Sequence, residues 1–231
     1  MDIQGLQKMT LLDFPGRVAC TVFLSGCDLR CPFCHNSELI EPGQAESVMT
    51  EEEFLSFLKK RKGLLDGVVF TGGEPLLRHE LPELIRKVRD LGYPVKLDTN
   101  GNHPAQLKKV LSEKLVDYVA MDIKNCREKY AVTCGLETMP LEKIDESIHM
   151  LMEGGCDYEF RTTVVKQLHD RDSFIGIAEW IRGAKRYYLQ SFTDRDTVLY
   201  DGFSAPDSKE IRAWADIVRP HVGLCEVRGV D

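Results

Sequence analysis

The chain has 231 residues, a length that is enough for one sizeable α/β domain. Its formal net charge of −7 at pH 7 argues against a nucleic-acid-binding protein, because such proteins normally carry a basic face. The N-terminus lacks the basic start and apolar run of a signal peptide, and no apolar run reaches the length of a membrane span. The eight cysteines lack a disulfide-like framework, so we expect a protein of the reducing cytoplasm.

Strand-type and helix-type patterns alternate along the chain after a turn at Pro15–Gly16. The first strand is expected over residues 18–24, which are β-branched and apolar. Thr50 and Glu53 then fit the capping box of a helix that Gly63 closes. Further strands are expected at residues 68–70, 93–97, 116–123, 158–165 and 187–192, with a short last one at 223–227, and further helices at 81–92, 104–114, 141–153, 172–182 and 206–218.

This alternation favours parallel strands joined by right-handed crossovers. Six such units predict an α/β fold, an incomplete (β/α)6 barrel, in a single domain of residues 1–231. Polar or reactive groups stand at the C-terminal ends of the expected strands: Cys27, Gly72 to Glu74, Asp98, Asp122 with Lys124, Arg161 and Gln190. Because barrel enzymes keep their active site at that face, we expect these groups to share one site.

Cys27, Cys31 and Cys34 lie on the loop that leaves the first strand, at spacings of four and three. Three thiolates on one short loop can hold three corners of an iron–sulfur cubane, and the fourth iron stays open for a substrate. A zinc site is the first alternative, but it usually needs four ligands, and His35 adjoins Cys34 too closely to supply the fourth. A disulfide between two of these cysteines is the second alternative, and it would need an oxidising compartment.

The other five cysteines are scattered, and we interpret them as buried or ordinary thiols. They are Cys20, Cys126, Cys134, Cys156 and Cys225. No loop is suited to a second cluster, with Cys126 and Cys134 as a weak exception.

The Cys-x3-Cys-x2-Cys motif with Phe33 before its last cysteine resembles the radical S-adenosylmethionine (SAM) superfamily. Its extension Cys34-His35-Asn36, with Gly26 ahead of the motif, is similar to the glycyl-radical-enzyme activating enzymes within that superfamily. The run Leu-Leu-Asp-Phe-Pro-Gly-Arg at residues 11–17 resembles one subgroup, the anaerobic ribonucleoside-triphosphate reductase activating proteins.

The resemblance runs from about Thr10 to the C-terminus and is weaker beyond Arg161. It implies the partial (β/α)6 barrel of the radical SAM type and a [4Fe–4S] cluster on the three cysteines, with SAM on the open iron. One departure is Asp28, where the subgroup often carries Asn.

The same resemblance implies a SAM site at the strand ends. It assigns Gly72, Gly73 and Glu74 to the methionine amino group; two glycines also allow close backbone approach to a ligand. It places Asp98 and Asp122 near SAM, in some relatives through a monovalent cation. Lys124 could meet the SAM carboxylate, and Arg161 corresponds to an arginine beside the cofactor.

Structural alternatives remain open for these residues. Gly72 to Pro75 could be only a turn, and residues 98–101 could be an Asx turn. Asp122 and Lys124 could form a buried ion pair, and Arg161 could be part of a structural salt bridge. Gln190 and His169 are weaker candidates. His35 and Asn36 are expected to shape the cluster loop rather than to perform acid–base chemistry, and no catalytic residue is assigned.

The activity implied by the resemblance is reductive cleavage of SAM, with an electron from reduced flavodoxin or ferredoxin. The resulting 5′-deoxyadenosyl radical takes a hydrogen from a glycine of a partner glycyl-radical enzyme, which the subgroup indicates is anaerobic ribonucleotide reductase. There are three alternatives. The chain could activate another glycyl-radical enzyme, or it could be a radical SAM enzyme that acts on a small molecule or peptide precursor. The third alternative is a non-catalytic iron–sulfur electron carrier or sensor.

Overall fold

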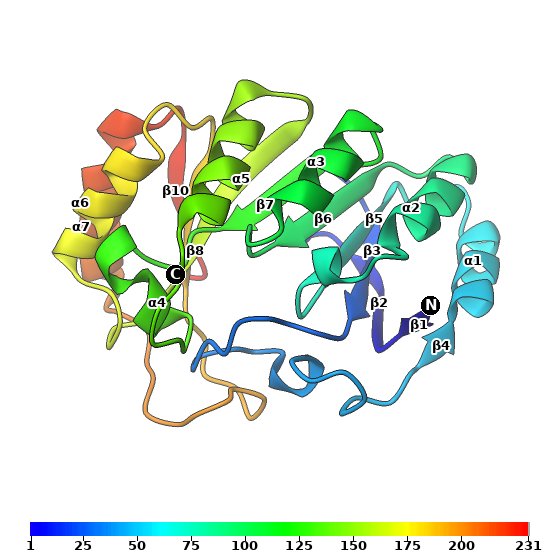
Figure 1. The fold of residues 1–231 in the computed structure, drawn as a ribbon, viewed down its shortest axis with the longest axis horizontal. Coiled ribbons are helices and arrows are strands. Elements are labelled where there is room, and N and C mark those ends of the chain that lie inside the picture. The colour runs from blue at the N-terminus through cyan, green and yellow to red at the C-terminus, as the bar shows by residue number, and fades with distance from the viewer. Residues whose placement is uncertain (231) are drawn as a thin grey trace.

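The computed structural model describes residues 1–230, whose main feature is a curved sheet of eight strands (Figure 1). In spatial order the strands are β10 (Cys225–Arg228), β9 (Tyr187–Ser191), β8 (Asp157–Val164), β7 (Tyr118–Asp122), β6 (Val95–Thr99), β5 (Gly67–Gly72), β3 (Ala19–Leu24) and β2 (Gly5–Thr10). Neighbouring strands pair in parallel except at one edge, where β2 runs antiparallel to β3. This topology confirms the predicted partial barrel of parallel strands.

The N-terminal segment differs from the expectation of a short lead-in to the first strand. It contains β2 and also β1 (Asp2–Ile3), which pairs with β4 (Met49–Thr50) in a separate two-stranded sheet. Most of β2 is exposed or half-buried because it is an edge strand, so its sequence lacks the apolar run that marked the buried strands. The expected strand at residues 93–97 begins at Val95 instead, directly after Pro94, which has no N–H for a sheet hydrogen bond.

Within the described residues 1–230, seven α-helices lie in the connections between strands: α1 (Glu51–Lys60), α2 (Leu81–Asp90), α3 (Pro104–Ser112), α4 (Tyr130–Thr133), α5 (Glu142–Glu153), α6 (Arg171–Trp180) and α7 (Ser208–Val218). The capping box of α1 is confirmed, since the amide of Glu53 donates to the Thr50 hydroxyl and the Thr50 amide donates to the Glu53 carboxylate. The helix ends at Lys60, three residues before Gly63. The short helix α4 was not predicted. Across residues 1–230, no helix is long and apolar enough to span a membrane.

The two faces of the sheet have different environments, because successive strand residues point to opposite sides. Figure 1 shows α2, α3 and α5 along one face. Val68, Phe70 and Leu97 belong to the large apolar core on that face, together with Ile85 of α2. Asp98, Asp122 and Arg161 each follow a residue of this core on their strands, so their side chains point to the other, concave face. The chain segment from 25 to 48 crosses that side of the sheet (Figure 1).

Phe14 packs against the concave face near the N-terminal ends of the strands. It forms a small separate apolar cluster with Ala19, Val69 and Tyr118, and its ring centroid lies 6.2 Å from that of Tyr118. A Cβ on Gly67 would come within 2.8 Å of the Phe14 ring, so the glycine leaves room for the aromatic side chain. The Phe14 side chain therefore fills one end of the barrel, while Leu11 and Leu12 beside it in the chain are exposed and the other end of the barrel holds the pocket.

Candidate functional site

One pocket at the C-terminal ends of the strands gathers most of the predicted site residues. Its walls include all three cysteines of the motif and groups from five strand ends: Cys27, Cys31, Cys34, Thr71, Gly72, Gly73, Asp98, Asp122, Lys124, Arg161 and Gln190. Parallel strands place their carboxyl ends at one edge, which is why residues far apart in the sequence meet there. Glu74 and His169 do not belong to this lining.

Backbone hydrogen bonds hold the cysteine loop against the end of β5. The amide of Gly73 donates to the carbonyl of Leu24 (2.9 Å), and the amide of Glu74 donates to that of Gly26 (2.7 Å). A Cβ on Gly72 would lie 2.2 Å from the Leu24 carbonyl oxygen, and one on Gly73 would lie 2.3 Å from that of Gly26. The two glycines are therefore required for close packing of β5 against β3 and the loop, while they also line the pocket.

The three thiols differ in their acidity. A hydrogen bond from Cys134 lowers the pKa of Cys31 to about 7. Burial raises the pKa of Cys27 to about 12 and also raises that of Cys34. Metal ligation requires thiolates, so cluster binding would release protons from these side chains.

The thiol arrangement fits a cluster better than a single ion. Within residues 1–230, no three His, Cys, Asp or Glu side chains are close enough together to hold one metal ion. A cubane is bound differently, because each cysteine ligates a separate iron at its own corner. The three pocket-facing cysteines thus suit a [4Fe–4S] cluster.

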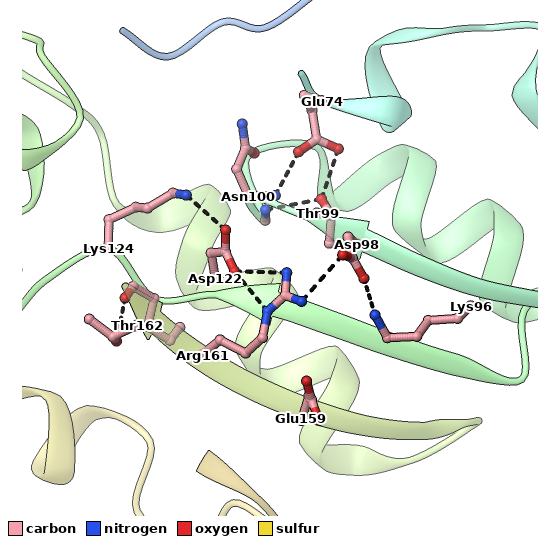
Figure 2. Close-up of polar contacts among 12 residues, drawn as sticks. Glu74, Lys96, Asp98, Thr99, Asn100, Asp122, Lys124, Glu159, Arg161 and Thr162 are labelled. Atoms are coloured by element: carbon pink, nitrogen blue, oxygen red, sulfur yellow. Dashed lines mark hydrogen bonds and ion pairs between the residues drawn. The ribbon is translucent and has the colours of Figure 1, made fainter. Parts of the chain in front are cut away.

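Glu74 is fully buried and serves as an acceptor between strand ends. One carboxylate oxygen accepts from the Leu76 amide (3.0 Å) and the Thr99 hydroxyl (2.9 Å), and the other accepts from the Asn100 amide (2.6 Å). Figure 2 shows the contacts with Thr99 and Asn100. Burial raises the pKa of this carboxyl to about 7. Its direct contact with a cofactor stays a prediction, since these contacts join the end of β5 to the end of β6.

Asp98, Asp122, Lys124 and Arg161 form one connected ion network, as Figure 2 shows. Arg161 lies between the two carboxylates, 3.2 Å from Asp98 and 3.0 Å from Asp122. Lys124 donates to the second oxygen of Asp122 at 2.8 Å. The sheet register explains the contact, because Asp122 lies directly opposite Arg161 on the concave face.

The network keeps Asp122, Lys124 and Arg161 charged despite their burial. Burial opposes ionisation of Lys124, but the carboxylate of Asp122 outweighs it and holds the pKa of Lys124 well above its ordinary value. In the same way, Asp98 and Asp122 raise the pKa of Arg161. Although burial would raise the pKa of Asp122, Lys124 and Arg161 lower it to about 2. The pocket therefore presents fixed cations to an anionic group.

Sequence reasoning missed two buried charges just below this network. Lys96 is 2% exposed and contacts the free oxygen of Asp98, and Glu159 is 1% exposed beneath Arg161. Each stands two residues before a predicted site residue on its strand, on the same concave face. The two-residue period of a strand is the signal that indicates them, because it places Lys96 on the same face as Asp98 and Glu159 on the same face as Arg161.

Asp28 links the cysteine loop to the end of β6. Its carboxylate accepts from Asn100 (3.0 Å), Asn102 (2.5 Å) and His103 (3.1 Å). Burial would raise the pKa of Asp28, but these hydrogen bonds hold it far below its ordinary value. Asn100, Asn102 and His103 were not predicted, because their partner lies more than 70 residues away along the chain.

His35 and Asn36 make contacts typical of a loop-shaping role. The His35 ring approaches the carbonyl of Thr193 (2.6 Å), and the Asn36 amide donates to the carbonyl of Gly72 (3.1 Å). His169 is buried and contacts the Lys124 carbonyl at 2.9 Å, outside the pocket lining. Gln190 does line the pocket.

The fold and the pocket together define a class of enzymes that hold a cluster and a cofactor at the open end of a partial barrel. The chain belongs to the radical SAM superfamily, whose family model matches residues 21–181. Its cofactors are a [4Fe–4S] cluster and SAM.

The chain is similar in sequence to two proteins with names and in fold to one solved structure. A Methanocaldococcus jannaschii protein, provisionally named a glycyl-radical enzyme activating enzyme, is 30% identical over 99% of this chain and 96% of its own. The pyruvate formate-lyase-activating enzyme of Clostridium pasteurianum is 34% identical over 53% of this chain and 52% of its own. In fold, Streptococcus suis SuiB bound to the precursor peptide SuiA matches 89% of this chain and 48% of that chain, with a TM-score of 0.70 and 14% identity.

Proposed function

We propose that this chain is an activating enzyme that installs a glycyl radical on a partner enzyme. The observation that carries the proposal is the single pocket shared by the three thiols and the strand-end ion network. Similarity to an activating enzyme over nearly the whole chain supports this assignment over other radical SAM activities. We further propose that residues 1–231 are one domain, with the continuous eight-stranded sheet as support.

The residues have the following proposed roles. Cys27, Cys31 and Cys34 hold the cluster, and Gly72 to Glu74 receive the amino group of SAM. Lys124 and Arg161 attract its carboxylate, and Asp98 and Asp122 fix these two cations in place. When bound, the cluster and SAM supply a one-electron cleavage that yields methionine and a 5′-deoxyadenosyl radical able to take a hydrogen atom from glycine.

The partner is proposed to be an anaerobic ribonucleoside-triphosphate reductase, on the resemblance of residues 11–17 and of Cys34-His35-Asn36 to its activases. Its glycine would reach the strand-end face on an extended loop near the partner's C-terminus. Closing the site around this loop would keep water from the radical. Reduced flavodoxin or ferredoxin would supply the electron in the cytoplasm.

The test is anaerobic reconstitution, reduction, addition of SAM and incubation with the reductase of the same organism. We expect the doublet of a glycyl radical in electron paramagnetic resonance (EPR). The whole partner should be a better substrate than the isolated glycyl peptide, because the peptide must lose more freedom on binding.

The same experiment distinguishes the alternatives. A doublet that forms only with another glycyl-radical enzyme would reject the reductase and keep the activating function. SAM cleavage without a glycyl radical on any such partner would favour a small-molecule or peptide substrate. A reconstituted, reduced protein that fails to cleave SAM would favour an electron carrier or sensor.

A further inference from the structure

The carboxylates of Asp98 and Asp122 face one pocket, where two negative charges would repel each other without cations nearby. Among the relatives that the sequence resembles, some place a monovalent cation at these positions. In this chain each of the four carboxylate oxygens already contacts a cationic side chain: Asp98 contacts Lys96 and Arg161, and Asp122 contacts Arg161 and Lys124.

Lys96 is the unexpected member of this set. Its side chain is only 2% exposed, and a buried lysine is rare unless it is paired. It stands two residues before Asp98 on β6, so both side chains point to the concave face. Figure 2 shows Lys96 and Arg161 approaching Asp98 from different sides, and Lys96 lies outside the lining of the pocket itself.

A metal cation would compete poorly at this site. It would need carboxylate oxygens as ligands, yet each oxygen is already engaged by an ammonium or a guanidinium. It would also stand close to the positive charges of Lys96 and Arg161, which would repel it. The three cations and two carboxylates leave one net positive charge, which suits the carboxylate of SAM without an added ion.

We propose that the Lys96 ammonium takes the place of a monovalent metal cation beside Asp98, so that this chain binds SAM independently of Na⁺ and K⁺. The second part rests on the proposed assignment of this pocket to SAM. Lys96 is a positioning residue in this scheme: it neutralises Asp98 from below and leaves Arg161 free to hold both carboxylates and face the cofactor.

The experiment compares the wild-type chain, Lys96→Met and Lys87→Met. Methionine keeps the unbranched shape of lysine and removes its charge. Lys87 is the control, because it also pairs with a carboxylate, that of Glu51 at 2.7 Å, but lies on α2 away from the pocket. The dissociation constant of SAM is measured anaerobically on each reconstituted protein in sodium, potassium and tetramethylammonium chloride at equal ionic strength.

The wild type and Lys87→Met should bind SAM equally in the three salts. Lys96→Met should bind about tenfold more weakly in tetramethylammonium chloride, a loss of about 1.4 kcal/mol, and should recover in sodium or potassium chloride. A second readout is sodium NMR relaxation of the cluster-free proteins, in which Lys96→Met alone should show bound sodium displaced by potassium.

Two results would overturn the inference. One is that the wild type binds SAM more tightly in sodium or potassium chloride than in tetramethylammonium chloride. This result needs only the wild type, so it can be obtained even if Lys96→Met does not fold. The other is a folded Lys96→Met protein that no metal cation rescues and that binds no sodium. If the wild type binds SAM in none of the salts, the assignment of the pocket fails instead, and sodium NMR of the two cluster-free proteins still decides the role of Lys96.

Discussion

Lys124 connects the two halves of the site at the level of a single residue. Its ammonium pairs with Asp122 and lies close enough to Cys31 for their charges to influence each other. A cation held there favours the thiolate form of a nearby cysteine. On the proposed assignment of the pocket, Lys124 would stabilise the cluster thiolates and also attract the carboxylate of SAM, so that the Asp-x-Lys spacing would serve both groups.

The three thiols of the loop should each be required for the cluster. Replacing Cys27, Cys31 or Cys34 by alanine leaves two protein thiolates, so we expect loss of bound iron and sulfide and loss of SAM cleavage. Cys156→Ala is the control, because this thiol is outside the pocket lining. A loop variant that keeps full cluster content and SAM cleavage would contradict the assignment.

At the scale of elements, α1 depends on its capping box. Thr50→Ala removes the acceptor for the Glu53 amide, which should lower the free energy of unfolding by about 1 kcal/mol. Urea unfolding of the reconstituted protein would show this as a lower midpoint with an unchanged slope. Ser56→Ala is the matched change inside the same helix, at an exposed position, and should not lower the midpoint.

An ion pair on the concave face, between Arg228 and Glu159, connects the last strand, β10, to β8. Arg228 of β10 donates twice, at 3.0 Å each, to Glu159 of β8, and its guanidinium carbon lies 3.3 Å from the Tyr188 ring centroid. Glu159 also accepts from the Tyr118 hydroxyl at 2.9 Å. Because the Glu159 side chain is 2% exposed, removal of Arg228 would leave a buried carboxylate without its cationic partner.

Arg228→Met should therefore lower the free energy of unfolding by about 2 kcal/mol, less than for a fully buried pair because Arg228 is partly exposed. Urea unfolding measures the change. Arg182→Met, which breaks an exposed pair with Glu179, should leave the midpoint unchanged. Adding Glu159→Gln to Arg228→Met should restore part of the loss; no recovery would show that Arg228 acts by packing alone.

For the whole molecule we predict one cluster per chain. The other five cysteines are spread through the structure, and only Cys134 contacts a thiol of the loop, that of Cys31. Iron and sulfide analysis after reconstitution should give about four of each per chain. About eight irons would mean that a second cluster exists and that the scattered cysteines were misinterpreted.

The sequence predicted most of the barrel because its parallel strands are buried on both faces and therefore read as apolar runs. It did not predict β2, whose exposed Gln7 and Lys8 hide its strand character. It predicted the strand-end residues of the pocket, because parallel topology alone brings them together. The contacts of Asp28 and Lys96 were missed, since they depend on how distant loops and side chains meet within the finished barrel.

The seven parallel strands follow one another in the sheet in the same order as in the chain. A chain emerging from the ribosome can therefore add each strand to an edge that already exists. Glu159 can nevertheless pair with Arg228 only after another 69 residues have been synthesised. At about 5–20 residues per second, synthesis takes between roughly 3 and 14 s to deliver that partner. During this interval the Glu159 carboxylate has the Tyr118 hydroxyl but not its arginine, and it lies beside an open sheet edge, which is the kind of unfinished edge that favours aggregation.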